Sequence, residues 1–290
     1  MVTLEQPLRT PSLIASVFGD AIAPRGGSVW LGTLSEILGV FGIAPGSVRT
    51  ALSRLAADGW VERMRDGRES HYSLTAGAEQ EFGQASEAIY RLGARAWDGE
   101  WRIAVLTEAD ESARRSLRSG LARSGYGQLS PNVLITPNHG EPDGGEAEGV
   151  LLLTGARTIG GAGARPLVRE AWPLDDIAAA YRRLMAAFEP IEARADRPNQ
   201  VSDLEALALR IFVIHQLRRV VLKDPDLPEA LLPDDWPAAE ARQRAAAIWL
   251  AFLKPSERWL DSRGRCATGR LPPPTKGFSL RFARPEGERG

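Results

Sequence analysis

The first 60 residues carry apolar side chains at helical spacing in three successive stretches, separated by glycine and proline. The first stretch predicts a helix that begins near Pro11 and stops at Pro24-Arg25-Gly26-Gly27. A short strand is expected at residues 29–31. Thr33 is expected to cap a second helix that ends at Gly42, because glycine accepts a positive φ at a tight corner. A third helix opens at residues 44–47 and stops at Gly59.

A hairpin is predicted directly after the third helix. Residues 60–65 and 68–75 are strand-like, and Asp66-Gly67 between them is a strong two-residue turn signal. This turn places Val61 opposite Tyr72 and Arg63 opposite Ser70. Two helices joined by a short glycine turn and followed by a hairpin are typical of a winged helix-turn-helix, which we assign to residues 1–75.

Eight polar side chains of the third helix and the hairpin lie off the apolar faces of these elements. Recognition helices enter the major groove with their N-terminal turns, and arginine pairs with guanine through two hydrogen bonds. Arginines in a wing suit phosphates or a minor groove. The predicted DNA contacts are Ser47, Arg49, Thr50, Ser53 and Arg54 of the helix, and Arg63, Arg65 and Arg68 of the hairpin. Exposed arginines are also common as solvated charge, so the prediction of DNA binding depends on the whole series of two helices, turn and hairpin.

The centre of the chain predicts a small mixed domain. After a linking helix over residues 76–96, strands are expected at 101–106, 133–136, 150–153 and 167–172, with helices at 111–123 and 174–188. This order favours a ferredoxin-like α/β domain over residues 97–190. The loop at residues 138–149 is rich in glycine and acids and is expected to be exposed and mobile.

The last third of the chain is predicted to be helical. Amphipathic helices are expected at residues 201–222 and 238–252, separated by a connector rich in proline, and they define a helical domain over 199–262. Residues 263–290 contain few apolar anchors and predict a weakly ordered tail. The expected fold class is therefore α+β with several domains.

Composition limits how such a protein holds DNA and where it works. The net charge of −1 gives no general attraction to nucleic acid, so DNA binding must depend on a few well-placed residues. This favours a homodimer bound to a palindromic site.

No apolar run of about 18 residues and no secretion signal occur, so we expect a cytoplasmic protein without a membrane span. Cys266 is the single cysteine, and the three histidines lack metal spacing, so no metal is expected.

Catalytic motifs are missing from the sequence. There is no HExxH, CxxC or G-x-S-x-G pattern, and the glycine-rich run from Gly155 to Arg165 lacks the lysine and Ser/Thr of a phosphate-binding loop. We therefore expect neither an enzyme nor a bound cofactor. Two alternatives stay open: a winged-helix adaptor that binds protein, and a nuclease-like enzyme that uses the middle domain.

Several stretches together resemble the PaaX-like family of bacterial regulators, the phenylacetic acid catabolon repressors. The matching stretches are Gly46–Trp60 (GSVRTALSRLAADGW), Tyr72–Thr75 (YSLT), Trp97–Arg102 (WDGEWR), Leu117-Arg118, Gly125–Leu129 (GYGQL), Asp224–Pro228 (DPDLP) and Leu231–Trp236 (LLPDDW). The resemblance implies a homodimeric repressor with a winged-helix head, a ferredoxin-like middle and a helical C-terminal domain. It also implies that an aryl-acyl coenzyme A thioester, typically phenylacetyl-CoA, releases the protein from DNA.

A site for such an effector needs cations for the phosphates and an apolar slot for the acyl group. His215, Arg218, Arg219 and Lys223 fall on neighbouring turns of one predicted helix, and they are the candidate effector-binding residues. A solvated or interface face is the alternative interpretation of the same four residues.

Overall fold

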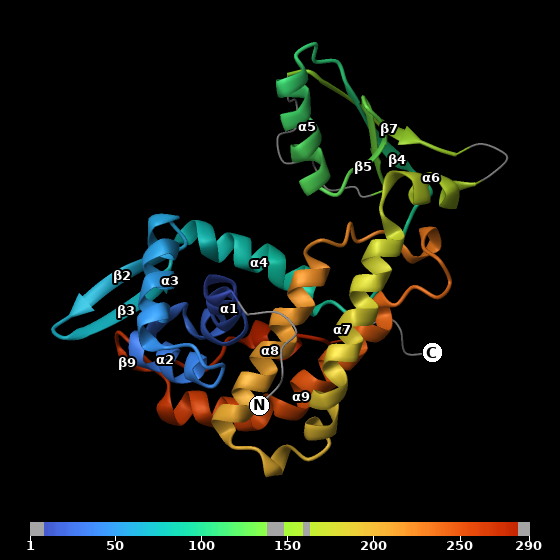
Figure 1. Ribbon diagram of the computed structural model, residues 1–290. Helices are drawn as coiled ribbons and strands as arrows, with labels where there is room; N and C mark the ends of the chain where they lie inside the picture. The colour runs from blue at the N-terminus through green and yellow to red at the C-terminus, as the bar shows by residue number, and fades with distance from the viewer. Residues whose placement is uncertain (1–8, 138–147, 159–162, 284–290) are drawn as a thin grey trace. The chain divides into compact units, whose positions relative to one another are not determined.

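The computed structural model describes residues 9–137, 148–158 and 163–283 of the chain (Figure 1). The chain divides into two compact units. The first comprises Met1–Leu92, Arg182–Leu222 and Glu240–Gly290, and the second comprises Gly93–Tyr181 and Lys223–Ala239. Within the described ranges, no helix is both long enough and apolar enough to cross a membrane.

The N-terminal head, defined here as residues 10–75, contains three helices that pack on one apolar core. They are α1 (Thr10–Val17), which continues through a π-helical turn (Phe18–Ile22) and a 3-10 turn (Ala23–Arg25), α2 (Leu31–Gly39) and α3 (Pro45–Ala57). Gly26 has a φ of +89° and ends the first helical segment where the sequence predicts, whereas α2 ends at Gly39, three residues before Gly42, whose φ is +74°. Thr33 does not cap α2, because the helix already begins at Leu31. The Oγ1 of Thr33 instead accepts a hydrogen bond from Arg265 N over 3.1 Å.

An antiparallel sheet of three strands completes the head. Its strands are β1 (Ser28–Trp30), β2 (Val61–Asp66) and β3 (Glu69–Leu74), in the order β1-β3-β2. The predicted register is wrong by two residues, since Val61 pairs with Leu74 and Arg63 with Tyr72. The turn lies at Gly67-Arg68, where Gly67 takes φ of +55°, and not at Asp66-Gly67. A shift of two residues leaves each side chain on its predicted face.

Helix α4 (Ala76–Tyr90) follows the hairpin, and Thr75 caps it by accepting from Ala78 N over 3.2 Å. The predicted linking helix over 76–96 is too long. The helix ends at Tyr90, where the guanidinium of Arg242 donates to the carbonyl of Ala88 over 2.6 Å and to that of Arg91 over 3.3 Å. These bonds satisfy terminal carbonyl groups that a longer helix would have paired internally.

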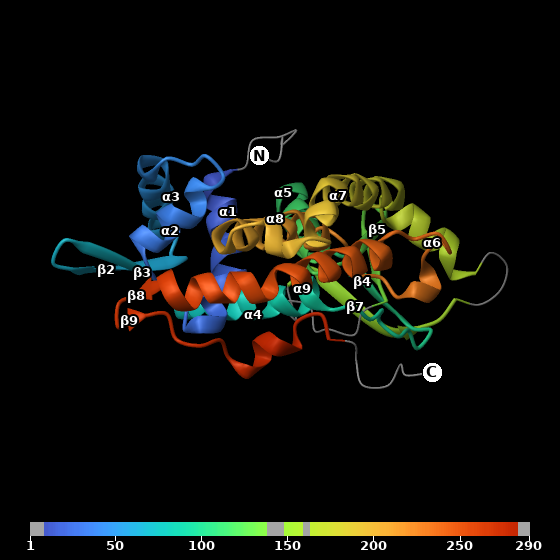
Figure 2. The ribbon, with the colours of Figure 1, turned by 90° about the horizontal axis from the view of Figure 1, so that it is seen from below.

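Two long helices from the second half of the chain share the core of the head. They are α8 (Asp203–Val221) and α9 (Ala238–Arg263), and both views show them running beside each other (Figure 2). Leu207 and Ile211 of α8 and Leu260 of α9 belong to the same apolar cluster as Leu13 and Leu34. The prediction of a separate helical domain over residues 199–262 differs from this arrangement, in which Arg182–Leu222 and Glu240–Gly290 form one unit with Met1–Leu92.

The C-terminal segment, residues 264–283, is packed against the head and α4. It contains β8 (Arg265–Cys266), β9 (Gly269–Arg270) and a 3-10 turn (Lys276–Leu280). Phe278 and Phe282 are buried, Thr275 N donates to Pro24 O over 2.9 Å, and Phe282 N donates to Tyr90 O over 3.1 Å. The prediction of a weakly ordered tail over 263–290 is therefore wrong for residues 263–283. Residues 284–290 lie outside the described residues.

The second unit contains an antiparallel sheet of four strands in the order β5-β6-β4-β7. Its elements are β4 (Trp101–Leu106), α5 (Glu111–Arg123), β5 (Gly127–Ser130), β6 (Val133–Thr136), β7 (Val150–Ala156) and α6 (Ala164–Ala171).

The predicted strand at residues 167–172 is wrong. A helix forms there because Pro166 stands in its first turn, where no N–H is needed, and Val168 is buried. Most of the predicted loop, residues 138–147, and part of the glycine-rich run, residues 159–162, lie outside the described residues.

Helix α7 (Leu174–Ala195) runs from the second unit into the first. Short 3-10 turns at Pro198–Gln200 and Glu229–Leu231 flank α8. Ser202 caps α8, since its hydroxyl accepts from Glu205 N over 3.2 Å.

Candidate functional site

The outer face of α3 carries all five of the predicted DNA-contact residues of that helix. Val48, Ala51 and Leu52 are buried on the inner face, which fixes the rotation of the helix about its axis. The opposite face therefore consists of exposed side chains, which are Ser47, Arg49, Thr50, Ser53 and Arg54. Thr50 Oγ1 donates to Gly46 O over 3.1 Å, and that bond holds the hydroxyl on the first turn of the helix.

The hairpin presents a second set of cations on the same head. Arg63, Arg65 and Arg68 are all exposed, and Arg63 donates to Ser70 Oγ over 2.8 Å. The hairpin projects from the group of helices that includes α3 (Figure 1). Within the described ranges, Arg49, Arg54, Arg65 and Arg68 form no ion pair, so their guanidinium groups are available to an anion outside the chain.

The four candidate effector residues do not form one cationic stripe. Arg218 turns toward α1 and donates to Ser12 O and to Ser16 Oγ, each over 3.1 Å. Arg219 is exposed and donates to Gln216 Oε1 over 3.3 Å, and Lys223 is exposed beyond the end of α8. The structure therefore brings His215 and Arg218 together around Ser16 and leaves the other two apart.

His215 is a buried, neutral residue and not a cation. Its Nδ1 lies 2.8 Å from Ser16 Oγ, and its side chain is 1% exposed. Burial, together with the neighbouring positive charges of Arg218 and Arg219, lowers the pKa of His215 to about 4. Near neutral pH this imidazole cannot neutralise a phosphate.

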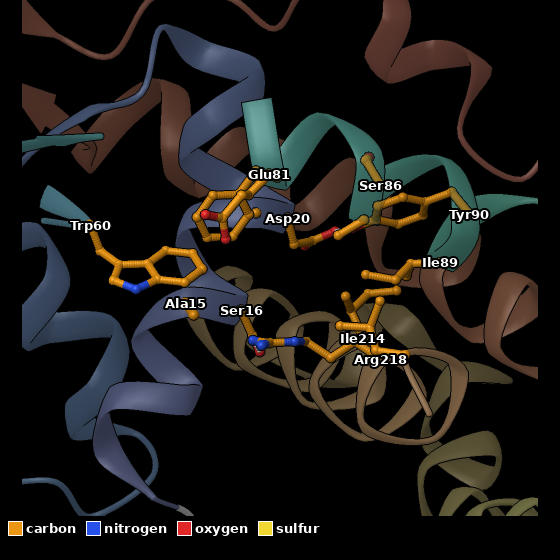
Figure 3. Close-up of a pocket in the computed structure, with 14 residues that line it drawn as sticks. Ala15, Ser16, Asp20, Trp60, Glu81, Ser86, Ile89, Tyr90, Ile214 and Arg218 are labelled. Carbon is orange, nitrogen blue, oxygen red and sulfur yellow. Dashed lines mark hydrogen bonds between the residues drawn. The ribbon is translucent and has the colours of Figure 1, made fainter. Parts of the chain in front are cut away.

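Arg218 and Ser16 border a pocket that no sequence pattern indicates (Figure 3). The pocket lies among α1, α4 and α8 and has a volume of about 170 Å³. Its wall is mostly apolar or aromatic, with Trp60, Phe82 and Tyr90 as its rings. These residues come from segments far apart in the sequence, so no local motif marks them.

A buried polar cluster adjoins the pocket and joins five separate parts of the first unit. Asp20 accepts from Tyr90 Oη over 2.7 Å, from Trp249 Nε1 over 2.9 Å and from Arg210 Nε over 2.8 Å. Arg281 donates to the backbone carbonyl of Asp20 over 2.7 Å. Burial raises the pKa of Asp20, but the charges of Arg210 and Arg281 outweigh burial and hold the pKa of that carboxyl below its usual value.

Glu257 extends the buried polar cluster to the end of the first helical segment. Its carboxylate accepts from Arg210 over 2.7 Å and from Arg25 over 2.5 Å. The sequence carries one signal for the cluster: Asp20 stands alone among apolar residues of a predicted helix, where a carboxylate is rarely buried unless it is paired. Within the described ranges, no group of three or more His, Cys, Asp or Glu side chains is placed to hold a metal ion.

Comparisons with known proteins match almost the whole chain. Three family models match it: PaaX-like protein over residues 9–78, the central Cas2-like domain of PaaX protein over 94–148, and the C-terminal domain of PaaX-like protein over 172–262. Transcriptional repressor PaaX of Escherichia coli (strain K12) is 32% identical over 286 residues, which cover 95% of this chain and 90% of that protein. A solved structure, the uncharacterized protein Rv0674 from Mycobacterium tuberculosis, has a TM-score of 0.61 at 26% identity, covering 87% of this chain and 99% of that one.

Proposed function

This chain belongs to the PaaX-like family, and from that premise we propose that it is a DNA-binding transcriptional regulator. More specifically, it represses genes for the catabolism of phenylacetate-type aromatic acids. The relative from Escherichia coli, whose name describes a transcriptional repressor, supports this assignment along nearly the full length of both chains.

The head is proposed as a winged helix-turn-helix, with α3 as the recognition helix and the β2–β3 hairpin as the wing. The positive φ of Gly42 turns the chain between α2 and α3, as the corner of such a motif requires. The four-stranded sheet of the second unit, with α5 on one face, supports a ferredoxin-like fold for the middle domain.

The observation that carries the DNA-binding proposal is the exposed polar face that α3 and the hairpin present together. The N-terminal turns of α3 offer Ser47, Arg49 and Thr50 to base edges, and the hairpin arginines reach phosphates or a minor groove. Because few cations are available and the net charge is −1, one head binds DNA weakly. A homodimer with two heads on a palindromic operator supplies the remaining affinity.

The effector of this regulator is proposed to be an acyl-CoA thioester, phenylacetyl-CoA or a close relative, which releases the protein from its operator. Such release requires that the ligand bind the DNA-free form more tightly than the DNA-bound form. The protein works without a metal or a bound cofactor, in the cytoplasm.

The test is a gel-shift titration of the purified chain on the DNA upstream of its own gene and of neighbouring genes. We expect specific binding whose affinity falls steeply with salt, and release on addition of phenylacetyl-CoA. A sedimentation measurement gives the oligomeric state. Absence of any specific DNA binding would overturn the proposal and favour a protein-binding adaptor.

A further inference from the structure

We propose that the pocket among α1, α4 and α8 binds the aryl-acyl group of the effector, with the aromatic ring in the apolar slot and an acyl oxygen at Arg218. This inference rests on the proposed function for the choice of ligand and on the geometry of the first unit for the site.

The size and lining of the pocket fit one aromatic ring. A buried apolar cavity of about 150 Å³ accommodates benzene, and this pocket has a volume of about 170 Å³. Trp60 and Tyr90 stand at opposite ends, and Ile89 and Ile214 lie below Tyr90 in this view (Figure 3). Aromatic walls favour another ring because edge-to-face contacts add to the hydrophobic gain.

Arg218 supplies the polar end of the site. Its guanidinium donates only to neutral oxygens, Ser12 O and Ser16 Oγ, and within the described ranges no carboxylate forms an ion pair with it. Burial lowers the pKa of Arg218, as expected for a cation that has lost water without gaining an anion.

The other charged groups of the pocket do not compensate Arg218. Asp20 already accepts from Arg210, Tyr90 and Trp249, and Glu81 is an exposed residue of the pocket wall. A carboxylate or thioester oxygen placed at Arg218 would accept a charge-assisted hydrogen bond, which is stronger than one between neutral groups.

Trp60 connects the pocket to the DNA-binding surface. Its backbone N–H donates to Leu55 O at the end of α3 over 2.8 Å, and its carbonyl accepts from Thr75 N beyond the hairpin over 3.2 Å. Its ring meets that of Phe82 edge to face, at 5.8 Å between centroids. A ligand that displaces this ring therefore acts on α3 and the hairpin together, while Ser16 transmits contact with Arg218 to α1.

The experiment is calorimetric titration of the full chain, without DNA, with phenylacetate, phenylacetyl-CoA and coenzyme A. Arg218→Gln removes the cation, and Ala85→Leu adds three carbons to the pocket wall. Lys254→Gln and Gln84→Leu are the matched controls, since each makes the corresponding change at an exposed residue that does not line the pocket. Thermal unfolding of every variant verifies that it is folded.

We expect Arg218→Gln and Ala85→Leu each to weaken binding at least tenfold and both controls to leave it unchanged. Binding of phenylacetate alone would assign the site to a free acid, and binding of only phenylacetyl-CoA would assign it to the thioester; both support the site. The assignment of this pocket is overturned if neither pocket variant weakens binding. It is also overturned if neither phenylacetate nor phenylacetyl-CoA binds. Gel shifts test the proposed function separately, because the site stands if ligand binds but DNA is not released.

Discussion

Arg210 and Asp20, 190 residues apart in the chain, form an ion pair that solvent does not reach. The Nε of Arg210 lies 2.8 Å from Asp20 Oδ2, and both side chains are 0% exposed. A buried carboxylate and a buried guanidinium each lose the solvation of water, so either one is destabilising without the other. The pair therefore makes α8 and the first helical segment dependent on each other.

We predict that Asp20→Asn lowers the free energy of unfolding by about 3–5 kcal/mol, because it leaves the charge of Arg210 buried with one anion fewer. Urea denaturation measures the loss. The control is Asp203→Asn, which breaks the exposed pair with Arg258 and is expected to cost about 1 kcal/mol or less. Equal losses of unfolding free energy for the two variants would show that the buried pair of Asp20 and Arg210 contributes no more to stability than the exposed pair.

The stability of the protein is predicted to fall as the pH decreases from about 6.5 to about 4. In this range the unfolded chain binds a proton at His215 that the folded chain does not, because the folded pKa is about 4. The slope is about 1.4 kcal/mol per pH unit for this one group. Asp20, whose folded pKa is lowered, adds a loss in the same direction only at still lower pH.

The His215→Asn variant tests this assignment, because asparagine keeps a polar atom near Ser16 Oγ but does not titrate. Urea denaturation of both proteins between pH 4 and 7 should give a flatter pH dependence for the variant. Parallel curves for the two proteins would mean that another group dominates the pH dependence in this range.

Arg49→Ala and Arg65→Ala are each predicted to weaken operator binding by about 1–3 kcal/mol, measured by gel shift at fixed salt. Arg49 is proposed to contact a base edge, so its loss should also relax the sequence preference of binding. Arg65 is proposed to contact a phosphate, so its loss should instead reduce the salt dependence of binding. Lys254→Ala, an exposed cation of α9, is the control and should leave binding unchanged. Unchanged binding for both arginine variants would contradict the contact assignment.

Phe278→Ala is predicted to destabilise the protein by about 3–5 kcal/mol, since a buried aromatic ring is lost next to Trp249. Leu280→Ala, in the same 3-10 turn, is the control because Leu280 is 69% exposed. The two variants are compared by thermal unfolding. If they unfold at the same temperature, the C-terminal segment does not contribute to the core.

The helices and strands of the head could be predicted because their signals are local. Apolar spacing, Gly42 and Gly59 mark their limits within a few residues of where they occur. The hairpin register could not be placed correctly, because Asp66-Gly67 and Gly67-Arg68 both offer a two-residue turn with glycine. Pairing along β3 decides between them.

What the sequence could not indicate depends on partners far along the chain. Phe278 and Phe282 look like isolated aromatic residues in a polar stretch until Trp249 and Tyr90 are placed beside them. The candidate effector stripe failed as a set for a similar reason. Helical spacing places His215 and Arg218 near each other, but only the packing of α1 against α8 shows that they meet at Ser16.

The contact between Asp20 and Arg281 also constrains how the protein is made. The ribosome adds Arg281 261 residues after Asp20, and the whole second unit is synthesised between them. During synthesis the nascent head therefore lacks one of the cations that contact Asp20, and it lacks Phe278, whose ring packs against that cation. N-terminal domains commonly fold first during translation. This head, in contrast, reaches its final stability only after the C-terminal segment has been synthesised.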